Sequence, residues 1–501
     1  MKGNYIIAIF YFILSITLKA QDNDSLILNG FHSISSNEIQ SFVEILCKPE
    51  WEGRRAGAPG YMEAANYIVD SLKSWGLKPA INDTSWFQTF PHEWTKILDA
   101  GSLAVNFKLN KDSIQKEYKF PEDYFPGSSS CTGKITAPAI WVGYGITAPE
   151  LNYDDYAGID VKNKIVLIEM EIPVNSNHKD YTKWSLHSST TSKLQNAINH
   201  GAIGLIFVAK LANPSLPYNK DFIYCYMKAN AVDELFLGTQ KNREKLIEEI
   251  KTNLKPKSLL LNKTISISAN TEHFPNNTCC NVLGLLEGTD SILKNEIIIL
   301  GAHLDGVGNA AAFFPSALDN ASGCVDLMAI AQALAKSKVD LKRSILFIFF
   351  GAEETGLRGS TFYVENPIFS KNKTLCMFNF DMVGNGRDIG VWGASSYPKI
   401  EQHFINANEK YIHRKFHSYK YTDNGGRPRT DGMVFGRAGY RTMAAITPSA
   451  VKKTYYHDIG DTPEAVVPEI MEDISKLFYL ALIDIANDET IDINEAINID
   501  K

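Results

Sequence analysis

The C-terminal half of the chain carries acidic residues and histidines directly after short apolar runs. Two imidazoles and several carboxylates are the kind of ligand set that a pair of divalent metal ions needs. The residue types alone therefore point to a metalloenzyme. The residues are His303 and Asp305 after 297–300, Asp319 after 317–318, Glu353 and Glu354 after 345–350, Asp381 after 377–380, and later His457.

The apolar runs predict the elements that position these residues. Short runs rich in β-branched and aromatic residues, broken by glycine, are typical of buried strands in a mostly parallel sheet. From Asn281 onward they alternate with helical segments, such as the one from Ser322 to about Lys336, which indicates an α/β domain. Ligands of open α/β sheets bind at the carboxyl ends of the strands. We therefore expect one rim of one sheet to gather the candidate ligands.

The spacing of the residues suggests a division of roles. His303 and Asp305 flank one residue at a strand end, so His303 can bind a metal while Asp305 holds the ring in orientation. Asp319 precedes a tight turn into a helix, which would fix a carboxylate able to bridge two cations. The adjacent Glu353 and Glu354 must diverge, so one can bind metal while the other stays free as a general base.

Asp381 and His457 complete the two ligand shells. Mixed nitrogen and oxygen ligands with open positions suit a catalytic pair of Zn²⁺ ions, for which Co²⁺ or Mn²⁺ can substitute. Two such ions about 3.5–4 Å apart stabilise a bridging hydroxide and polarise a carbonyl. Each residue alone has an ordinary explanation as a turn, cap or surface pair, so the prediction rests on the joint set. His92-Glu93 lacks the second histidine of an HExxH helix, so the sequence does not support a thermolysin-type zinc site.

Composition and the N-terminus bear on location and partners. A chain of 501 residues is expected to form two or three domains, and its formal charge of −7 argues against a nucleic-acid partner. Lys2, the apolar run 5–18 and Ala20 are typical of a signal peptide over 1–20, and the run is shorter than the about 20 residues of a membrane span. We expect an exported protein, periplasmic or extracellular, with no stable membrane span. The oligomeric state is left open.

The sequence pattern changes between 134 and 268, where expected short strands and one helix suggest a smaller β-rich domain with its own core. We therefore predict an insert at 134–268 between two parts of a larger domain, 21–133 and 269–501. The seven cysteines show no CxxC pairing of a structural zinc site, and they permit no disulfide assignment.

A series of motifs runs in order through the mature chain. They are Gly53-Arg54 with Gly57 and Gly60, Asn281-Val282-Leu283-Gly284, Gly301-Ala302-His303-Leu304-Asp305, Ala317-Leu318-Asp319-Asn320, Gly351-Ala352-Glu353-Glu354, Asn379-Phe380-Asp381, and Tyr456-His457 with Asp461-Thr462. The ordered set resembles the co-catalytic di-zinc aminopeptidase family, which includes secreted bacterial leucyl aminopeptidases and is related to glutamate carboxypeptidase and transferrin receptor. The insert resembles a protease-associated domain, on Gly143-Tyr144-Gly145, 153–156, Lys193 and Gly201-Ala202.

The resemblance implies an α/β fold with a mixed, mostly parallel sheet flanked by helices. It implies that His303 and Asp381 bind one zinc, that Glu354 and His457 bind the other, and that Asp319 bridges. It also implies that Glu353 is the catalytic base and that Asp305 orients His303. The chain departs from the family at Thr430-Asp431-Gly432, where relatives often have Ser-Asp-His, and at Gly306. Those departures bear on pocket shape.

The implied activity is that of a secreted zinc aminopeptidase acting on peptides. Three alternatives stay open. A glutaminyl cyclase shares the fold but lacks the insert. A carboxypeptidase would need a basic pocket, which Arg427, Arg429, Arg437 or Arg441 could supply. A non-catalytic, receptor-like binding protein would have lost metal ligands, whereas every ligand is present here.

Overall fold

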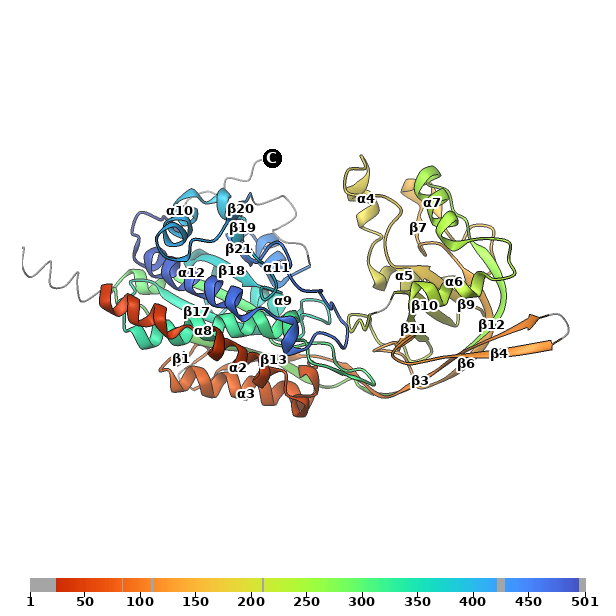
Figure 1. Cartoon of the computed structure of the whole chain (residues 1–501), viewed down its shortest axis with the longest axis horizontal. Coiled ribbons are helices and arrows are strands. Elements are labelled where there is room, and N and C mark those ends of the chain that lie inside the picture. The colour runs from red at the N-terminus through yellow and green to blue at the C-terminus, as the bar shows by residue number, and fades with distance from the viewer. Residues whose placement is uncertain (1–23, 83, 110–111, 210, 421–428, 495–501) are drawn as a thin grey trace, which may run out of the picture.

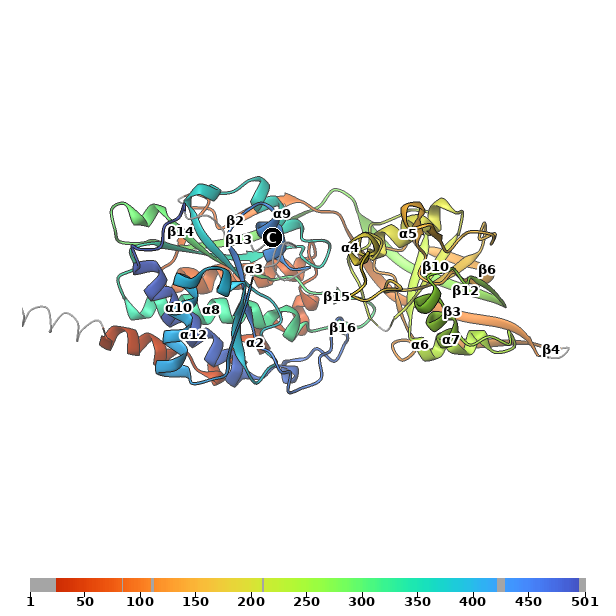
Figure 2. The same cartoon turned by 90° about the horizontal axis from the view of Figure 1, so that it is seen from above.

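Two large sheets organise the molecule, and each supports its own lobe (Figures 1 and 2). The structure is a computed structural model that describes residues 24–494 except 83, 110–111, 210 and 421–428. The predicted signal peptide and Arg427 lie outside the described residues. No helix within the described ranges is both long and apolar enough to cross a membrane.

The first sheet has nine strands in the order β1-β13-β17-β14-β18-β21-β19-β20, with β2 paired to β13. Its central strands β17, β14, β18 and β21 run parallel, and β13 is antiparallel to β17. The strands are β1 (Lys78–Pro79), β2 (Phe87–Pro91), β13 (Thr278–Leu286), β14 (Ile297–His303), β17 (Ser344–Phe350), β18 (Thr374–Phe380), β19 (Ile389–Trp392), β20 (Phe416–Tyr419) and β21 (Thr442–Ile446). This mixed sheet confirms the predicted architecture.

Helices cover both faces of the first sheet because alternate strand residues point to opposite sides. Ile298 and Leu300 belong to one core, with α2 (Ser36–Leu46), α3 (Pro59–Ser74), α8 (Ser322–Ser337), α10 (Pro398–Ala407) and α12 (Pro468–Asn487). Ile297 and Ile299 belong to the other, with α9 (Arg358–Glu365) and α11 (Asp431–Arg437). Burial on both faces explains the unbroken apolar runs of the central strands.

The second sheet has eight strands in the order β4-β3-β12-β6-β9-β10-β11-β5. They are β3 (Trp94–Leu109), β4 (Asp112–Tyr118), β5 (Tyr124–Pro126), β6 (Gly133–Trp141), β9 (Ile165–Glu169), β10 (Gly204–Val208), β11 (Ile223–Met227) and β12 (Leu259–Phe274). Four helices accompany them: α4 (Tyr181–Ser185), α5 (Thr190–Asn199), α6 (Ala229–Asp233) and α7 (Arg243–Asn253).

The second lobe is wider than the expected insert of 134–268, because residues 94–126 contribute three strands to its sheet. Its ends meet where Trp94 pairs with Phe274, and their rings stack 4.9 Å apart. The expected boundary at 133/134 cuts through this sheet. The reason is that β3 pairs with β12, about 170 residues along the chain, and alternation within β3 does not reveal that partner. The likeness of the insert to a protease-associated domain remains a prediction.

The lobes touch beside the candidate ligands. The backbone N–H of Ala212, in the second lobe, donates to the carbonyl of His457 at 3.1 Å. A core of the second lobe also contains three residues of the first lobe, Val307, Ala310 and Phe314. All seven cysteines are buried and unpaired, so no disulfide ties the lobes.

Candidate metal centre

The candidate ligands lie at one rim of the first sheet, where its parallel strands end. His303 is the last residue of β14 and lies level with Phe350, the last residue of β17. Glu353 and Glu354 follow β17, and Asp381 follows β18. Asp319 is in the turn that leads into α8, and His457 is in the loop after β21. All are buried except Glu353, which is half-buried.

Asp319 lies between the two histidines. Its Oδ1 is 3.3 Å from Nε2 of His303, and its Oδ2 is 3.6 Å from Nε2 of His457. On the outer sides, Asp381 Oδ1 is 3.8 Å from His303 Nε2, and Glu354 Oε2 is 2.8 Å from His457 Nε2. The set therefore has the arrangement of two metal sites that share one carboxylate.

The donor atoms also fit two cations by chemistry. Ligand atoms of His303, Glu353 and Asp381 lie within 4.8 Å of one another, and so do those of Asp319, Glu354 and His457. Burial lowers the pKa of His303, but Glu353, Asp319 and Asp381 outweigh it and raise that pKa well above its ordinary value. Glu354 Oε1 is buried without a hydrogen-bond partner. Cations held here would offset the repulsion among these carboxylates.

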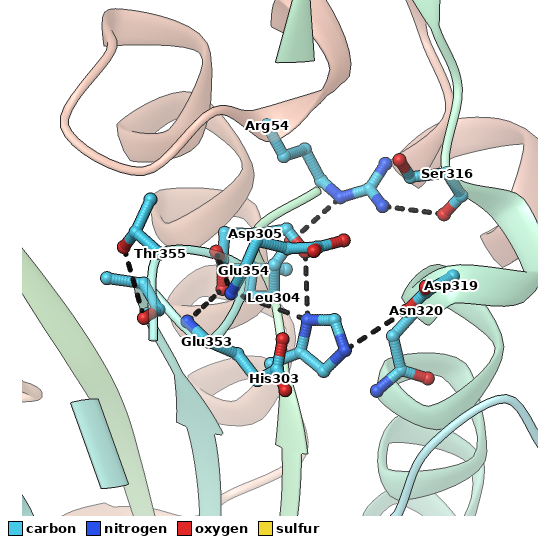
Figure 3. A network of polar contacts seen from close by, with 12 residues as sticks. Arg54, His303, Leu304, Asp305, Ser316, Asp319, Asn320, Glu353, Glu354 and Thr355 are labelled. Carbon is cyan, nitrogen blue, oxygen red and sulfur yellow. Dashed lines mark hydrogen bonds and ion pairs between the residues drawn. The ribbon is translucent and has the colours of Figure 1, made fainter. Parts of the chain in front are cut away.

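Asp305 is fully buried, and its carboxylate makes hydrogen bonds that the sequence did not predict (Figure 3). Its carboxylate accepts the backbone N–H groups of Glu353 at 3.1 Å and Glu354 at 3.2 Å. His303 Nδ1 donates instead to the backbone carbonyl of Asp305 at 3.0 Å, while the carboxylate is 3.8 Å away. Asp305 thus turns His303 Nε2 toward the ligands through its backbone and fixes the glutamate turn through its carboxylate. Burial raises the pKa of Asp305 to about 6.

Two further residues hold the loops that carry the candidate ligands. Asn320 donates to the carbonyl of Phe380 at 2.9 Å and accepts from the N–H groups of Gly323 and Met382, which ties the Asp319 turn to the Asp381 loop. Asp461 accepts the N–H groups of Leu318 at 2.8 Å and Asp319 at 3.0 Å. Both residues belong to the sequence motifs described above, but the sequence does not show which backbone groups their side chains bind.

Arg54 connects the N-terminal segment to the site (Figure 3). Its buried guanidinium donates to four backbone carbonyls, those of Leu46, Leu304, Pro315 and Ser316, at 2.5–3.0 Å. Leu304 precedes Asp305, and Ser316 begins the turn that carries Asp319. Arg54 therefore fixes two ligand-bearing loops relative to each other.

A cavity of about 820 Å³ opens beside the ligands. Glu353, Glu354 and His457 form one side, and segments 170–176 and 188–191 of the second lobe form part of the other. Tyr456, for which the sequence alone indicates no role, stacks on His457 with ring centroids 3.9 Å apart. Arg429 also lines this cavity, whereas Arg437 and Arg441 do not.

Comparison with known proteins places these observations in context. Residues 281–482 match the model of peptidase family M28. Leucine aminopeptidase 2 of Trichophyton equinum is 31% identical over 214 residues, which are 42% of this chain and 40% of that protein. Leupeptin-inactivating enzyme 1 of Streptomyces exfoliatus is 35% identical over 113 residues, 22% of this chain and 25% of its own. The chain thus matches less than half of the length of these relatives.

Two solved structures resemble the chain over both lobes. An aminopeptidase from Aneurinibacillus sp. strain AM-1 is 20% identical with a TM-score of 0.64, covering 94% of this chain and 99% of its own. A zinc aminopeptidase from Bacillus subtilis is 22% identical with a TM-score of 0.62, covering 93% and 99%. At these identities, the likeness shows a shared fold.

Proposed function

Residues 281–482 match peptidase family M28, and on this premise we propose that the chain belongs to this family and is a zinc-dependent aminopeptidase that removes N-terminal residues from peptides. The observation that carries the proposal is Asp319, whose two oxygens face His303 and His457. A carboxylate shared between two histidine-containing clusters serves a pair of metal ions. A mere turn residue would not need this arrangement.

The ligands would divide between two zinc ions, for which Co²⁺ or Mn²⁺ can substitute. His303 and Asp381 would hold one, Glu354 and His457 would hold the other, and Asp319 would be shared between them. When bound, such a pair lowers the pKa of a water molecule and polarises the scissile carbonyl. Asp305, Asn320 and Asp461 keep the ligand loops in place through the hydrogen bonds described above.

Glu353 is the general base. Its backbone is fixed by Asp305, and its half-buried side chain lines the cavity. It accepts a proton as the water oxygen bonds to the scissile carbonyl carbon, and it returns that proton to the leaving amine as the C–N bond breaks. Burial raises the pKa of Glu353 well above its ordinary range.

Two conservative variants test the assignment. Glu353→Gln should lower the turnover of leucine p-nitroanilide by about 10²–10⁴-fold while the protein keeps both metal equivalents. Glu354→Gln should instead lose one equivalent. Metal content is measured by mass spectrometry beside turnover. Near-parent turnover of Glu353→Gln, or metal loss from that variant alone, would overturn the assignment.

Carboxypeptidase activity is a second candidate because Arg429 lines the metal cavity. Peptides blocked at either end separate the two activities. An aminopeptidase hydrolyses C-terminally amidated peptides with a free N-terminus, whereas a carboxypeptidase hydrolyses N-acetylated peptides with a free C-terminus. Conversion of N-terminal glutamine without peptide cleavage would indicate a cyclase, and metal binding without turnover of any of these peptides would indicate a binding protein.

We further infer export to the periplasm or the extracellular space. The support is the N-terminal pattern of Lys2, the apolar run 5–18 and Ala20. N-terminal sequencing of the protein purified from culture medium or periplasm should find a start close to Gln21.

A further inference from the structure

A second cavity, of about 560 Å³, lies at the junction of the two lobes. The first lobe contributes Arg55, His92 and Arg358, and the second contributes the segment 214–218. This cavity adjoins the metal cavity, because Thr191, Ser215 and Gly356 line both. A ligand bound at the metals could therefore extend into it.

Arg55 is the unusual residue of this cavity. Arg55 is 7% exposed, and among the described residues its side chain makes one hydrogen bond, a long one of 3.5 Å from Nη1 to the carbonyl of Val307. Within the described ranges, no carboxylate lies at ion-pair distance from it. A guanidinium has five N–H donors, and buried charges in proteins are normally paired. Arg55 therefore presents donors that the protein itself does not use.

Trp94 and His92 have the same character, and Arg358 adds an exposed guanidinium. Trp94 Nε1 and both ring nitrogens of His92 are buried without a hydrogen-bond partner of normal geometry. Burial, together with Arg55 and Arg358, lowers the pKa of His92 to about 3, so its ring is neutral near pH 7. The guanidinium of Arg358 donates to the carbonyl of Thr355 at 3.3 Å and has no ion pair among the described residues. The cavity thus combines two guanidiniums without an ion pair, one buried and one exposed, with neutral polar groups.

The acidic residues of the cavity stand at its solvent edge. Glu93 and Glu365 also line it, and both are exposed. Glu93 lies 3.9 Å from His273. Water screens such exposed charges far more than the buried Arg55. The inner part of the cavity therefore favours an anion.

We propose that this cavity binds a carboxylate of the peptide substrate, held by Arg55 and Arg358 while the N-terminus lies at the metals. The planar fork of an arginine matches a carboxylate in a bidentate pair. The carboxylate belongs either to the C-terminus of a short peptide or to an acidic side chain downstream of the cleaved bond. The inference rests on the proposed aminopeptidase function and names its substrate class.

The test compares leucine-initiated glycine peptides of two, three and four residues, each as free acid and as amide. At the length that reaches the cavity, kcat/KM for the acid should exceed that for the amide by about tenfold or more, as expected of a charge-assisted hydrogen bond. Arg55→Gln and Arg358→Gln should bring this ratio toward one. Arg358 is exposed, so its variant gives an answer even if Arg55→Gln does not fold. Arg437→Gln, exposed and outside both cavities, is the matched control.

The outcomes separate the possible sources of the carboxylate. Peptide amides with aspartate downstream of the cleaved bond are tested as well. If these amides show the arginine-dependent increase in kcat/KM and the free acids do not, the bound carboxylate is that of a side chain. Equal kcat/KM for acids and amides at every length, with no preference for aspartate, overturns the proposal. So does an unchanged ratio in Arg358→Gln, or a ratio that falls only in Arg429→Gln.

Binding separates this inference from the proposed function. Leucine p-nitroanilide has no carboxylate, so its hydrolysis tests the aminopeptidase assignment alone. Calorimetric titration of the metal-loaded protein with the same acids and amides measures the cavity directly. Tighter binding of acids without any hydrolysis would refute the proposed activity and leave the carboxylate site standing.

Discussion

Replacing Asp305 with Asn tests how the glutamate turn is held. Asn keeps the shape and the backbone carbonyl that accepts from His303 Nδ1. It keeps only one acceptor oxygen, however, whereas the carboxylate accepts both the Glu353 and Glu354 N–H groups. One backbone N–H would face an amide NH₂ group. The substitution should therefore disturb Glu354 and its metal more than His303 and its metal.

The magnitude follows from the lost interaction. A hydrogen bond to a charged acceptor contributes about 1.5–3 kcal/mol, which corresponds to a change of about 10- to 150-fold in an equilibrium constant. Groups that orient metal ligands typically change metal affinity by about 10–100-fold. We expect the affinity for the metal held by Glu354 and His457 to fall within this range, while the affinity of the other site stays near that of the parent.

The assay counts metal per chain after dialysis against a chelator that the parent withstands. His303→Ala and Asp305→Asn should each retain about one equivalent, because each variant mainly weakens a different one of the two ions. The double variant should retain none. Asp326→Asn is the matched control: Asp326 is fully buried outside the site, accepts one hydrogen bond from Ser475, and has a pKa that burial raises well above the ordinary value. Asn resembles that neutral acid and should leave both metals bound.

A double variant that retains as much metal as His303→Ala would refute this reasoning. It would mean that Asp305 acts through His303 alone, as the sequence suggested. Loss of metal from Asp326→Asn to the same extent would show that any buried aspartate substitution perturbs the site, and the difference between the two ions would then carry no information.

Three further predictions follow from the contacts. Asp319→Asn should weaken both metals together, measured by chelator titration, because each carboxylate oxygen faces a different histidine; retention of one tight equivalent would contradict bridging. Lys193→Met should destabilise the second lobe by about 3 kcal/mol, since Lys193 Nζ donates to the carbonyls of 169, 170 and 171. Thermal melting and proteolysis at 170–176 check this against Lys183→Met, an exposed control, and equal melting of the two would count against it. Excising 95–273 with a short linker between the paired Trp94 and Phe274 should raise activity on long peptides relative to short ones, because the second lobe walls the metal cavity; unchanged size selectivity in a folded, metal-binding product would exclude that role.

Local sequence patterns were sufficient for most elements and for the composition of the site. The helix expected from Ser322 to about Lys336 corresponds to α8. Its spacing of apolar residues is a property of neighbouring residues. The candidate ligands were recognisable because parallel strands place their carboxyl ends at one rim, so a chemical group after each apolar run indicates a shared location.

Tertiary structure decided what depends on partners far apart in the chain. Strand β3 belongs to the second lobe because it pairs with β12. Asp305 carries its carboxylate to the Glu353–Glu354 turn, 48 and 49 residues away. Arg55 and Arg358 line one cavity although about 300 residues separate them. Sequence specifies which groups are available, and the packing of strands and loops determines which donors meet an acceptor and which, as in Arg55, are left for a ligand.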